Sequence, residues 1–83
     1  MEVRYTHKAA EDFKGLSRDT QERIAKKMRF YASQQKPLKF AKRLVDPREG
    51  EFRFRVGDYR IFFDVKKDTL FILKIKHRKD AYE

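Results

Sequence analysis

The spacing of apolar residues changes twice along the chain and predicts a strand, then two helices, then three strands. Residues 2–5 alternate between apolar and polar in the manner of a short strand. Thr6 is suited to cap a first short helix that Gly15 ends, and Ser17 is suited to cap a longer second helix. The second helix carries an apolar stripe at helical spacing: Ile24, Met28, Tyr31 and Ala32. We expect the two helices to form an antiparallel hairpin.

Between residues 35 and 50 the regular spacing disappears. Pro37 is expected to end the second helix, and Asp46-Pro47 with Gly50 is typical of a turn. Basic residues are interleaved here with apolar ones: Lys36, Lys39, Lys42 and Arg43 with Leu38, Phe40 and Leu44. Two interpretations stay open. The segment is either a loop pinned by its apolar residues with its lysines in solvent, or a basic rim that holds a nucleic-acid backbone.

Two alternating runs on either side of Gly57-Asp58 predict a tight hairpin, because glycine reaches positive φ at little cost. Folding at this pair places Arg55 opposite Arg60 and Arg53 opposite Phe62, so the three arginines share one face of the ribbon. The other face is apolar and is expected to meet the helices. Arg55 and Arg60 repel each other, which costs stability. A face that gathers guanidinium groups despite this repulsion favours an anionic partner such as phosphate.

A third strand is expected over residues 69–77, and the length of the loop before it decides which side chains face the core. A loop of even length would turn Lys74 and Lys76 toward the apolar face. Burying unpaired lysines costs more than a bulged or three-residue loop, so we predict a loop of odd length. The odd loop turns three residues toward the core: Phe71, Leu73 and Ile75. It moves Lys74, Lys76 and Arg78 to the face of the three arginines.

Composition indicates one small basic domain that spans residues 1–83. Eight Phe and four Tyr among 83 residues compensate for the limited core of so short a chain. The absence of Cys excludes disulfides and thiolate metal sites. No apolar run reaches the length of a membrane span and no signal-peptide pattern opens the chain, so we expect a cytoplasmic protein with no membrane partner. The formal net charge of +9 points to a polyanion, either nucleic acid or an acidic protein.

The residue types present favour a polybasic site over metal or carboxylate catalysis. His7 and His77 are the only histidines, and no cluster has the spacing of metal ligands, so we expect no metal and no cofactor. The three glycines fit turn or cap positions, which leaves no phosphate-binding loop. His77 and Tyr82 are the groups that can handle protons. Such a site suits RNA cleavage by attack of a 2′-hydroxyl on the adjacent phosphorus, because arginines stabilise the charge that grows on the non-bridging oxygens.

Two segments of the sequence resemble the RelE family of bacterial and archaeal toxins. They are residues 53–61, which read RFRVGDYRI, and residues 77–82, which read HRKDAY. The resemblance implies the RelE/ParE fold, an α+β fold in which an N-terminal strand and a helical hairpin pack on one face of a small antiparallel sheet. It also implies the toxin of a type II toxin–antitoxin system. Such a toxin is a ribosome-dependent endoribonuclease that cleaves mRNA in the ribosomal A site and is neutralised by a small acidic antitoxin.

The resemblance also assigns roles to individual residues. Arg53 and Arg55 match two basic residues on the strand before the hairpin turn, and Arg60 matches the arginine after it. It implies that Arg55 and Arg60 stabilise the transition state, that Arg78 assists the leaving oxygen, and that Tyr82 stacks on a nucleotide and orients its base. Further contacts to RNA, including rRNA of the ribosome, are expected from five basic residues: Lys39, Lys42, Arg43, Lys74 and Lys76.

The sequence departs from the family at Arg53. The best-known members carry lysine there, where it is proposed as general base, and arginine, with a pKa above about 12, is a poor proton acceptor. Arg53 either positions the 2′-hydroxyl or leaves the proton to His77. The predicted register places His77 on the opposite face from Arg78, which favours a structural histidine at a strand end.

Two other functions stay open alongside mRNA cleavage. One is inhibition of DNA gyrase in the manner of ParE, which needs no nuclease chemistry. The other is RNA binding by a catalytically inactive relative, which the absence of lysine at position 53 favours. We also expect an antitoxin partner. The C-terminal portion of the antitoxin is expected to lie across or near the face of the toxin that carries the arginines.

Overall fold

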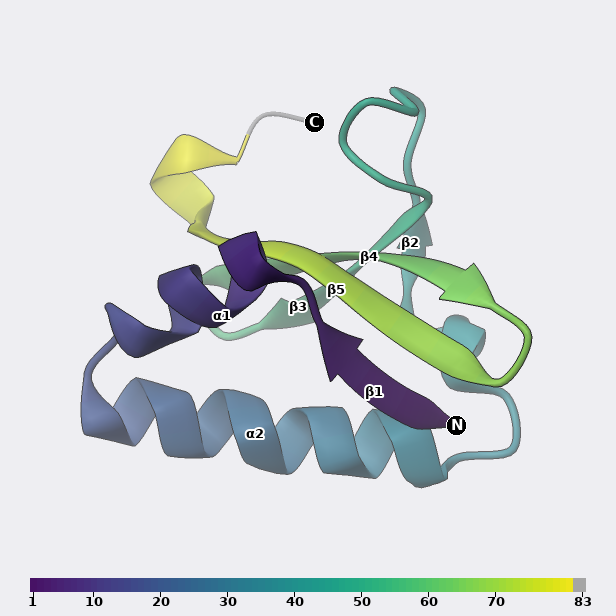
Figure 1. Cartoon of the computed structure of the whole chain (residues 1–83), viewed down its shortest axis with the longest axis horizontal. Helices are drawn as coiled ribbons and strands as arrows, with labels where there is room; N and C mark the ends of the chain where they lie inside the picture. The colour runs from purple at the N-terminus through teal and green to yellow at the C-terminus, as the bar shows by residue number, and fades with distance from the viewer. Residues whose placement is uncertain (82–83) are drawn as a thin grey trace.

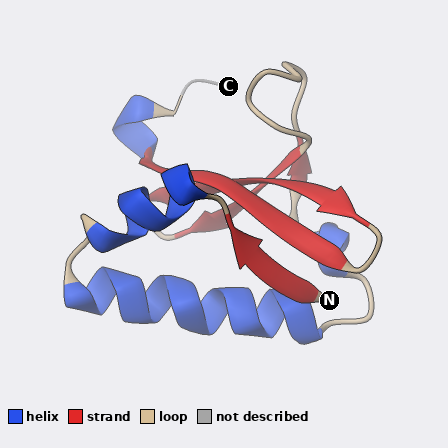
Figure 2. Ribbon diagram, in the orientation of Figure 1, coloured by secondary structure: helices blue, strands red, loops and turns tan. Residues whose placement is uncertain are grey.

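Two α-helices cover one face of a mixed β-sheet (Figures 1 and 2). The computed structural model describes residues 1–81. Its elements in chain order are β1 (Glu2–Tyr5), α1 (His7–Lys14), α2 (Arg18–Ser33), the 3₁₀ helix η1 (Pro37–Phe40), β2 (Lys42–Arg43), β3 (Phe52–Val56), β4 (Tyr59–Lys66), β5 (Thr69–His77) and the 3₁₀ helix η2 (Arg78–Asp80). The predicted α+β class, with a helical hairpin packed on the sheet, is confirmed. The N-terminal strand, expected with the hairpin on one face of an antiparallel sheet, is instead an edge strand that pairs parallel to β5, so the sheet is mixed.

Both helices begin where the sequence predicts. Thr6 Oγ1 accepts a hydrogen bond from the backbone N–H of Ala9 at 3.1 Å, and Ser17 Oγ accepts one from the N–H of Thr20 at 3.2 Å. These side chains satisfy amide groups that have no partner inside the helix. Helix α1 ends at Gly15, as predicted.

The strands lie in the order β1-β5-β4-β3-β2, with β1 parallel to β5 and the other pairs antiparallel. Beyond the end of β1, side chains take over the hydrogen bonding along that edge of β5. Thr6 Oγ1 donates to the carbonyl of Leu73 at 3.1 Å, and a carboxylate oxygen of Asp12 accepts from the N–H of Ile75 at 3.0 Å. Helix α1 is thereby fastened to the sheet at both of its ends.

The first hairpin has the predicted register. Strands β3 and β4 pair Arg55 with Arg60 and Arg53 with Phe62. Gly57 in the turn has a φ of 59°, a conformation that costs glycine little. The alternation on both sides of the turn therefore specified which residues face the helices.

The second hairpin differs from the prediction. Its turn is the two-residue pair Lys67-Asp68, because Lys66 pairs directly with Thr69, so the predicted loop of odd length is wrong. The register shifts between the pairs made by Phe62 and Phe63, which leaves Leu73 as the extra residue of β5. A β-bulge places the extra residue inside the strand and reverses the side-chain alternation after it.

The bulge changes which residues of β5 enter the core. Before it, Leu70 and Ile72 are fully buried, whereas Phe71 and Leu73, which we expected there, are only partly buried. After it, Ile75 lies in the core as predicted, and the two lysines of the strand lie on the opposite face. Residues of β5 on both sides of the bulge at Leu73 therefore point into the core.

The segment between α2 and β3 contains elements that its lack of periodicity did not predict. Pro37 is buried at the start of η1. Strand β2 forms the outer edge of the sheet and pairs Lys42 with Arg53. The interpretation as a simple loop is therefore wrong for β2, because a strand of two residues is too short to show alternation.

Gly50 allows the loop between β2 and β3 to close onto the bulge of β5. Its φ is 120°, and a Cβ at this position would lie 2.9 Å from Leu73 Cδ1. We expect Gly50→Ala to lower the free energy of unfolding by about 1–3 kcal/mol, because alanine is strained at this φ and meets Leu73. Urea unfolding followed by circular dichroism measures the loss.

Gly15→Ala is the matched control for this prediction. Gly15 has a φ of −76°, and a Cβ there would meet its nearest neighbour at 3.6 Å. We expect this variant to be as stable as the native chain or slightly more stable. An equal loss of stability in both variants would contradict the role given to Gly50.

The centre of the core is a stack of aromatic rings. The ring of Phe54 lies 4.2 Å from that of Tyr31 on α2 and 4.3 Å from that of Phe63 on β4, measured between centroids. The hydroxyl of Tyr31 donates to the carbonyl of Arg55 at 3.4 Å, and burial raises the pKa of this phenol. The stack therefore holds the inner side of the strands whose outer side carries the arginines.

Candidate nucleic-acid interface

Residues that face each other on neighbouring strands form two rows across the outer side of the sheet. The first row runs over four strands and contains Lys42, Arg53, Phe62 and Lys74. The second runs over three and contains Arg55, Arg60 and Lys76. We call these seven residues the basic face. From the geometry of strands, the backbones of neighbouring residues within a row are about 4.7–4.9 Å apart, and the two rows are separated by two residues along each strand, about 6.6–6.8 Å.

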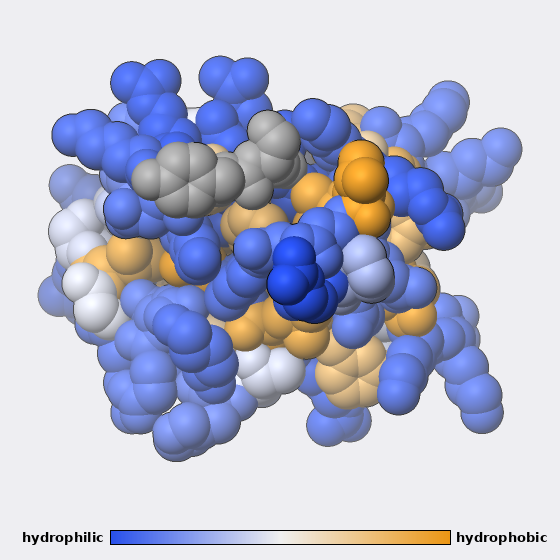
Figure 3. Space-filling model, turned by 90° about the horizontal axis from the view of Figure 1, so that it is seen from above, coloured by the Kyte–Doolittle hydropathy of each residue, from blue (hydrophilic) through white to orange (hydrophobic). Residues whose placement is uncertain are grey.

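The basic face lies on the side of the sheet opposite α2. Figure 1 shows the β2–β3 loop and η2 rising from the two ends of this side. Figure 3 looks onto it and shows mostly hydrophilic side chains around a few apolar ones. Helix α2 therefore does not stand between the two rows and an extended anionic chain that binds on this side.

Arg60 is held in place at the hairpin turn. One of its terminal nitrogens, Nη1, donates to the carbonyls of Gly57 and Tyr59 at 3.1 and 3.2 Å. Arg55 lies directly opposite and is exposed, while Arg53 in the neighbouring row is partly buried. Two guanidinium groups in register concentrate positive charge, and a planar guanidinium suits a phosphate better than an ammonium does.

The side chain of Lys74 on β5 is mostly buried, with 18% of its surface exposed. It forms an ion pair with Glu49 of the β2–β3 loop, and its Nζ lies 4.8 Å from the centre of the Phe62 ring. Burial first, and then the positive charges of Lys76 and Lys8, lower the pKa of Lys74, while the negative charges of Asp46 and Asp12 oppose this shift. We assign Lys74 mainly to fixing the loop over the first row.

Arg78 and His77 occupy places that the predicted register only partly describes. Arg78 lies past the end of β5, in η2, so it belongs to neither row; its Nε is 3.7 Å from a carboxylate oxygen of Asp58. His77 pairs with Tyr59, ring centroids 5.3 Å apart, and its Nδ1 accepts from the N–H of Lys79 at 3.2 Å. This geometry agrees with a structural histidine that caps η2.

The remaining predicted RNA contacts do not all meet at the basic face. Lys39 lies in η1 and is exposed, away from both rows. Arg43 pairs with Phe52 and its guanidinium carbon lies 5.5 Å from that ring. Tyr82 lies outside the described residues. The sequence did not predict that Lys42 shares a row with Arg53. This position follows from the pairing of the two-residue strand β2 with β3, which leaves no pattern in a single sequence.

Residues 3–82 of the chain match the family model described as the ParE toxin of the type II toxin–antitoxin system parDE. The chain belongs to this toxin family. The toxin matches no curated protein.

Solved structures of RelE proteins have the same fold as the toxin. Against the toxin–antitoxin complex RelBE2 from Mycobacterium tuberculosis, the TM-score is 0.75 with 28% identity, over 93% of this toxin and 96% of that chain. Against the RelB–RelE complex from Methanococcus jannaschii it is 0.67 with 26% identity, over 93% and 92%. The archaeal RelE–RelB complex from Pyrococcus horikoshii OT3 shares the fold at a TM-score of 0.74 and 24% identity, over 96% and 97%. The resemblance to the RelE/ParE superfamily is thus confirmed.

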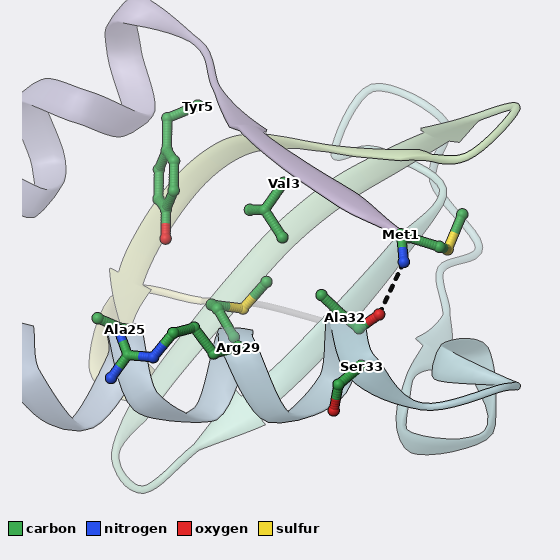
Figure 4. A pocket seen from close by; sticks show the side chains of 8 residues that line it. Met1, Val3, Tyr5, Ala25, Arg29, Ala32 and Ser33 are labelled. Carbon is green, nitrogen blue, oxygen red and sulfur yellow. Dashed lines mark hydrogen bonds between the residues drawn. The ribbon is translucent and has the colours of Figure 1, made fainter.

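A groove of about 510 Å³ lies far from the basic face, between β1 and α2 of the toxin (Figure 4). Val3 and Tyr5 line it from β1, and Ala25 and Ala32 line it from α2. The N-terminal ammonium donates to the carbonyl of Ala32 at 2.7 Å and closes one end. The groove is mainly apolar and therefore differs in chemistry from the basic face.

Two further properties of residues 1–81 bear on the kind of site. No three His, Asp or Glu side chains of this part of the toxin are grouped so as to hold a metal ion. None of its helices has the length and apolar character needed to cross a membrane. The chemistry available on the described part of the basic face is that of guanidinium and ammonium groups, because Phe62 is only 1% exposed.

Proposed function

We propose that the toxin is an endoribonuclease that cleaves mRNA in the ribosomal A site by attack of a 2′-hydroxyl on the adjacent phosphate. The observation that carries this proposal is the direct opposition of Arg55 and Arg60 on a sheet face whose two rows contain five further positions and no carboxylate. Such an arrangement costs stability through repulsion and is relieved when an anion binds. The likeness to RelE structures supports it further.

In this proposal Arg55 and Arg60 stabilise the charge that develops on the non-bridging oxygens of the cleaved phosphate. Because Arg60 is already fixed by two backbone carbonyls, it needs little reorganisation during the reaction. We assign Arg53 to positioning the 2′-hydroxyl in line with the leaving oxygen, since arginine is a poor proton acceptor. Arg78 assists the leaving oxygen and Tyr82 stacks on a base. We assign His77, whose ring packs on Tyr59 and whose Nδ1 caps η2, a structural role. The proton of the 2′-hydroxyl then passes to solvent water as the P–O2′ bond forms, and the leaving 5′-oxygen takes a proton from water as its bond to phosphorus breaks.

The 2′-hydroxyl mechanism gives a sharp prediction. Replacing the nucleotide before one cut by its 2′-deoxy form is expected to abolish cleavage there and to leave cleavage at other positions of the same mRNA unchanged. Primer extension on the mRNA in a translating extract, with and without ribosomes, measures both the cuts and their dependence on the ribosome. Cleavage that continues at the 2′-deoxy position would contradict the mechanism, because the attacking group would be absent.

Inhibition of DNA gyrase is a second candidate function, favoured by the match to the ParE family model. A supercoiling assay with purified gyrase separates the two. Loss of supercoiling together with intact mRNA would replace the nuclease proposal. Binding to RNA without cleavage in either assay would identify an inactive relative.

The proposal includes a small acidic antitoxin as partner and action in the cytoplasm, where ribosomes are found. Three solved structures similar to the toxin are toxin–antitoxin complexes of RelE proteins. A net charge of +9 favours an acidic partner, and the apolar groove between β1 and α2 offers its non-polar side chains a surface. We expect the C-terminal portion of the antitoxin to cover the basic face. Simultaneous binding of RNA and antitoxin at full strength would contradict this blocking mode.

A further inference from the structure

We infer that the hollow beneath the β2–β3 loop binds a single nucleobase of the RNA whose phosphates lie on the basic face. The hollow has a volume of about 320 Å³ and opens beside the first row. The inference rests on the proposed function, because both need RNA on the basic face. It adds a site for a base to a site for phosphates.

The hollow has the apolar walls that a planar base requires. Leu44 and Val45 line it from the loop, and Phe62 lines it from β4. Val45 is 98% exposed, so it contributes almost nothing to the core of the toxin, whereas Phe62 at the floor of the hollow is only 1% exposed. The apolar surface that the hollow offers to a ligand is therefore mainly that of Leu44 and Val45.

The charges around the hollow suit an anionic strand. Lys42 and Arg43 are part of its lining and supply two cations. The carboxylates of Asp46 and Glu49 also line it, but each is already in an ion pair, with Arg48 and Lys74 respectively. The wall therefore does not repel phosphates, and its cations attract them.

The position of the hollow links it to the basic face. Lys42 and Phe62 belong both to its lining and to the first row. The two rows are about 6.6–6.8 Å apart, so a phosphate on Arg55 and Arg60 leaves the neighbouring nucleotide beside the first row. An apolar hollow at this distance from a phosphate site fits a base of the same strand better than it fits an isolated apolar side chain.

The loop that forms the hollow is held in one conformation by its own contacts. The N–H of Leu44 donates to the carbonyl of Glu51 at 2.9 Å, and the N–H of Glu49 donates to the carbonyl of Asp46 at 3.0 Å. Asp64 accepts from the N–H of Glu51 at 2.9 Å and so fastens the loop to β4. A preformed hollow loses little entropy when a ligand enters it.

Nuclear magnetic resonance on the isotopically labelled full chain tests the inference directly. The probes are the ribotrinucleotide ApApA and its analogue in which all three nucleosides are abasic, which carries the same backbone charge. We expect ApApA to shift the methyl resonances of Leu44 and Val45 through the ring current of a base. We expect the abasic analogue to shift only resonances of the basic face and to bind about five- to thirtyfold more weakly, the usual range for one base contact.

Two variants sharpen the test. Val45→Ala removes two exposed methyl groups from the wall of the hollow. It is expected to reduce the preference for ApApA over the abasic analogue to about twofold, because we attribute that preference to the contact between a base and this wall. Leu38→Ala, an exposed leucine of η1 outside the hollow, is expected to keep the preference. An unchanged preference in Val45→Ala would overturn the inference.

The outcomes also separate this inference from the proposed function. Shifts on the basic face with both probes, and none at Leu44 or Val45, would overturn the base site and leave the nuclease proposal standing. Absence of any shift on the basic face at low salt would overturn both. Shifts of Leu44 and Val45 with an acidic apolar tripeptide, but not with ApApA, would assign the hollow to a protein partner instead.

Discussion

Replacing Arg60 by alanine is expected to reduce cleavage of mRNA in a translating extract by about a hundredfold to a thousandfold, the usual cost of removing one preorganised donor from a transition-state site. Arg60 is directly opposite Arg55, and its Nη1 is anchored to the carbonyls of Gly57 and Tyr59. On the proposed mechanism, the loss falls on the chemical step, because the charge on the non-bridging oxygens is greatest in the transition state. Primer extension quantifies the cuts.

Stability distinguishes a catalytic loss at Arg60 from a folding defect. Arg60→Ala relieves the repulsion with Arg55 but loses the hydrogen bonds to the carbonyls of Gly57 and Tyr59, so its free energy of unfolding is expected to stay within about 1 kcal/mol of the native value. Arg18→Ala is the matched control, since Arg18 is an exposed arginine at the start of α2, away from the basic face. It should cleave normally. Normal cleavage by Arg60→Ala would remove Arg60 from the site.

Phe54→Ala is expected to lower the free energy of unfolding by about 3–5 kcal/mol. Phe54 has no exposed surface and its ring stacks on both Tyr31 and Phe63. Its removal leaves a cavity between α2 and the sheet that the surrounding strands cannot fill. The total stability of a domain of this size is on the order of 5–10 kcal/mol, so the variant is expected to be close to unfolding at physiological temperature.

Urea unfolding of the purified variant checks this expectation, with Phe40→Ala as control. Phe40 in η1 is 46% exposed and contacts Tyr31 at the edge of the core, with ring centroids 5.4 Å apart. Its loss should cost clearly less than that of Phe54. A midpoint for Phe54→Ala within the error of the native value would show that the aromatic stack is not the centre of the core.

The residues of the first hairpin could be placed from the sequence because two independent signals agree there. Strict alternation identifies the faces of β3 and β4, and Gly57 identifies the turn that sets their register. The starts of both helices were equally readable, since Thr6 and Ser17 act within three residues of themselves. Local signals of this kind need no knowledge of the rest of the fold.

The features that the sequence did not reveal depend on contacts between distant residues. The bulge at Leu73 is accompanied by hydrogen bonds from Thr6 and to Asp12, more than sixty residues away in the chain. Strand β2 exists only through its pairing with β3. Arg78 leaves the strand because His77 caps η2. The sequence therefore predicted the register of Arg53, Arg55 and Arg60 and named Lys42 as an RNA contact, but not the pairing that puts Lys42 beside Arg53 or the hollow next to it.

The position of β5 determines when the toxin can fold during its own synthesis. Strand β1 pairs only with β5, Glu2 opposite Thr69, and β5 separates β1 from the rest of the sheet. The first strand made must therefore wait for nearly the last, a high contact order that slows folding. Both basic rows also lack their β5 lysines until then. On the proposed function, no active toxin can exist before the ribosome has made β5, because both the sheet and the basic rows need that strand.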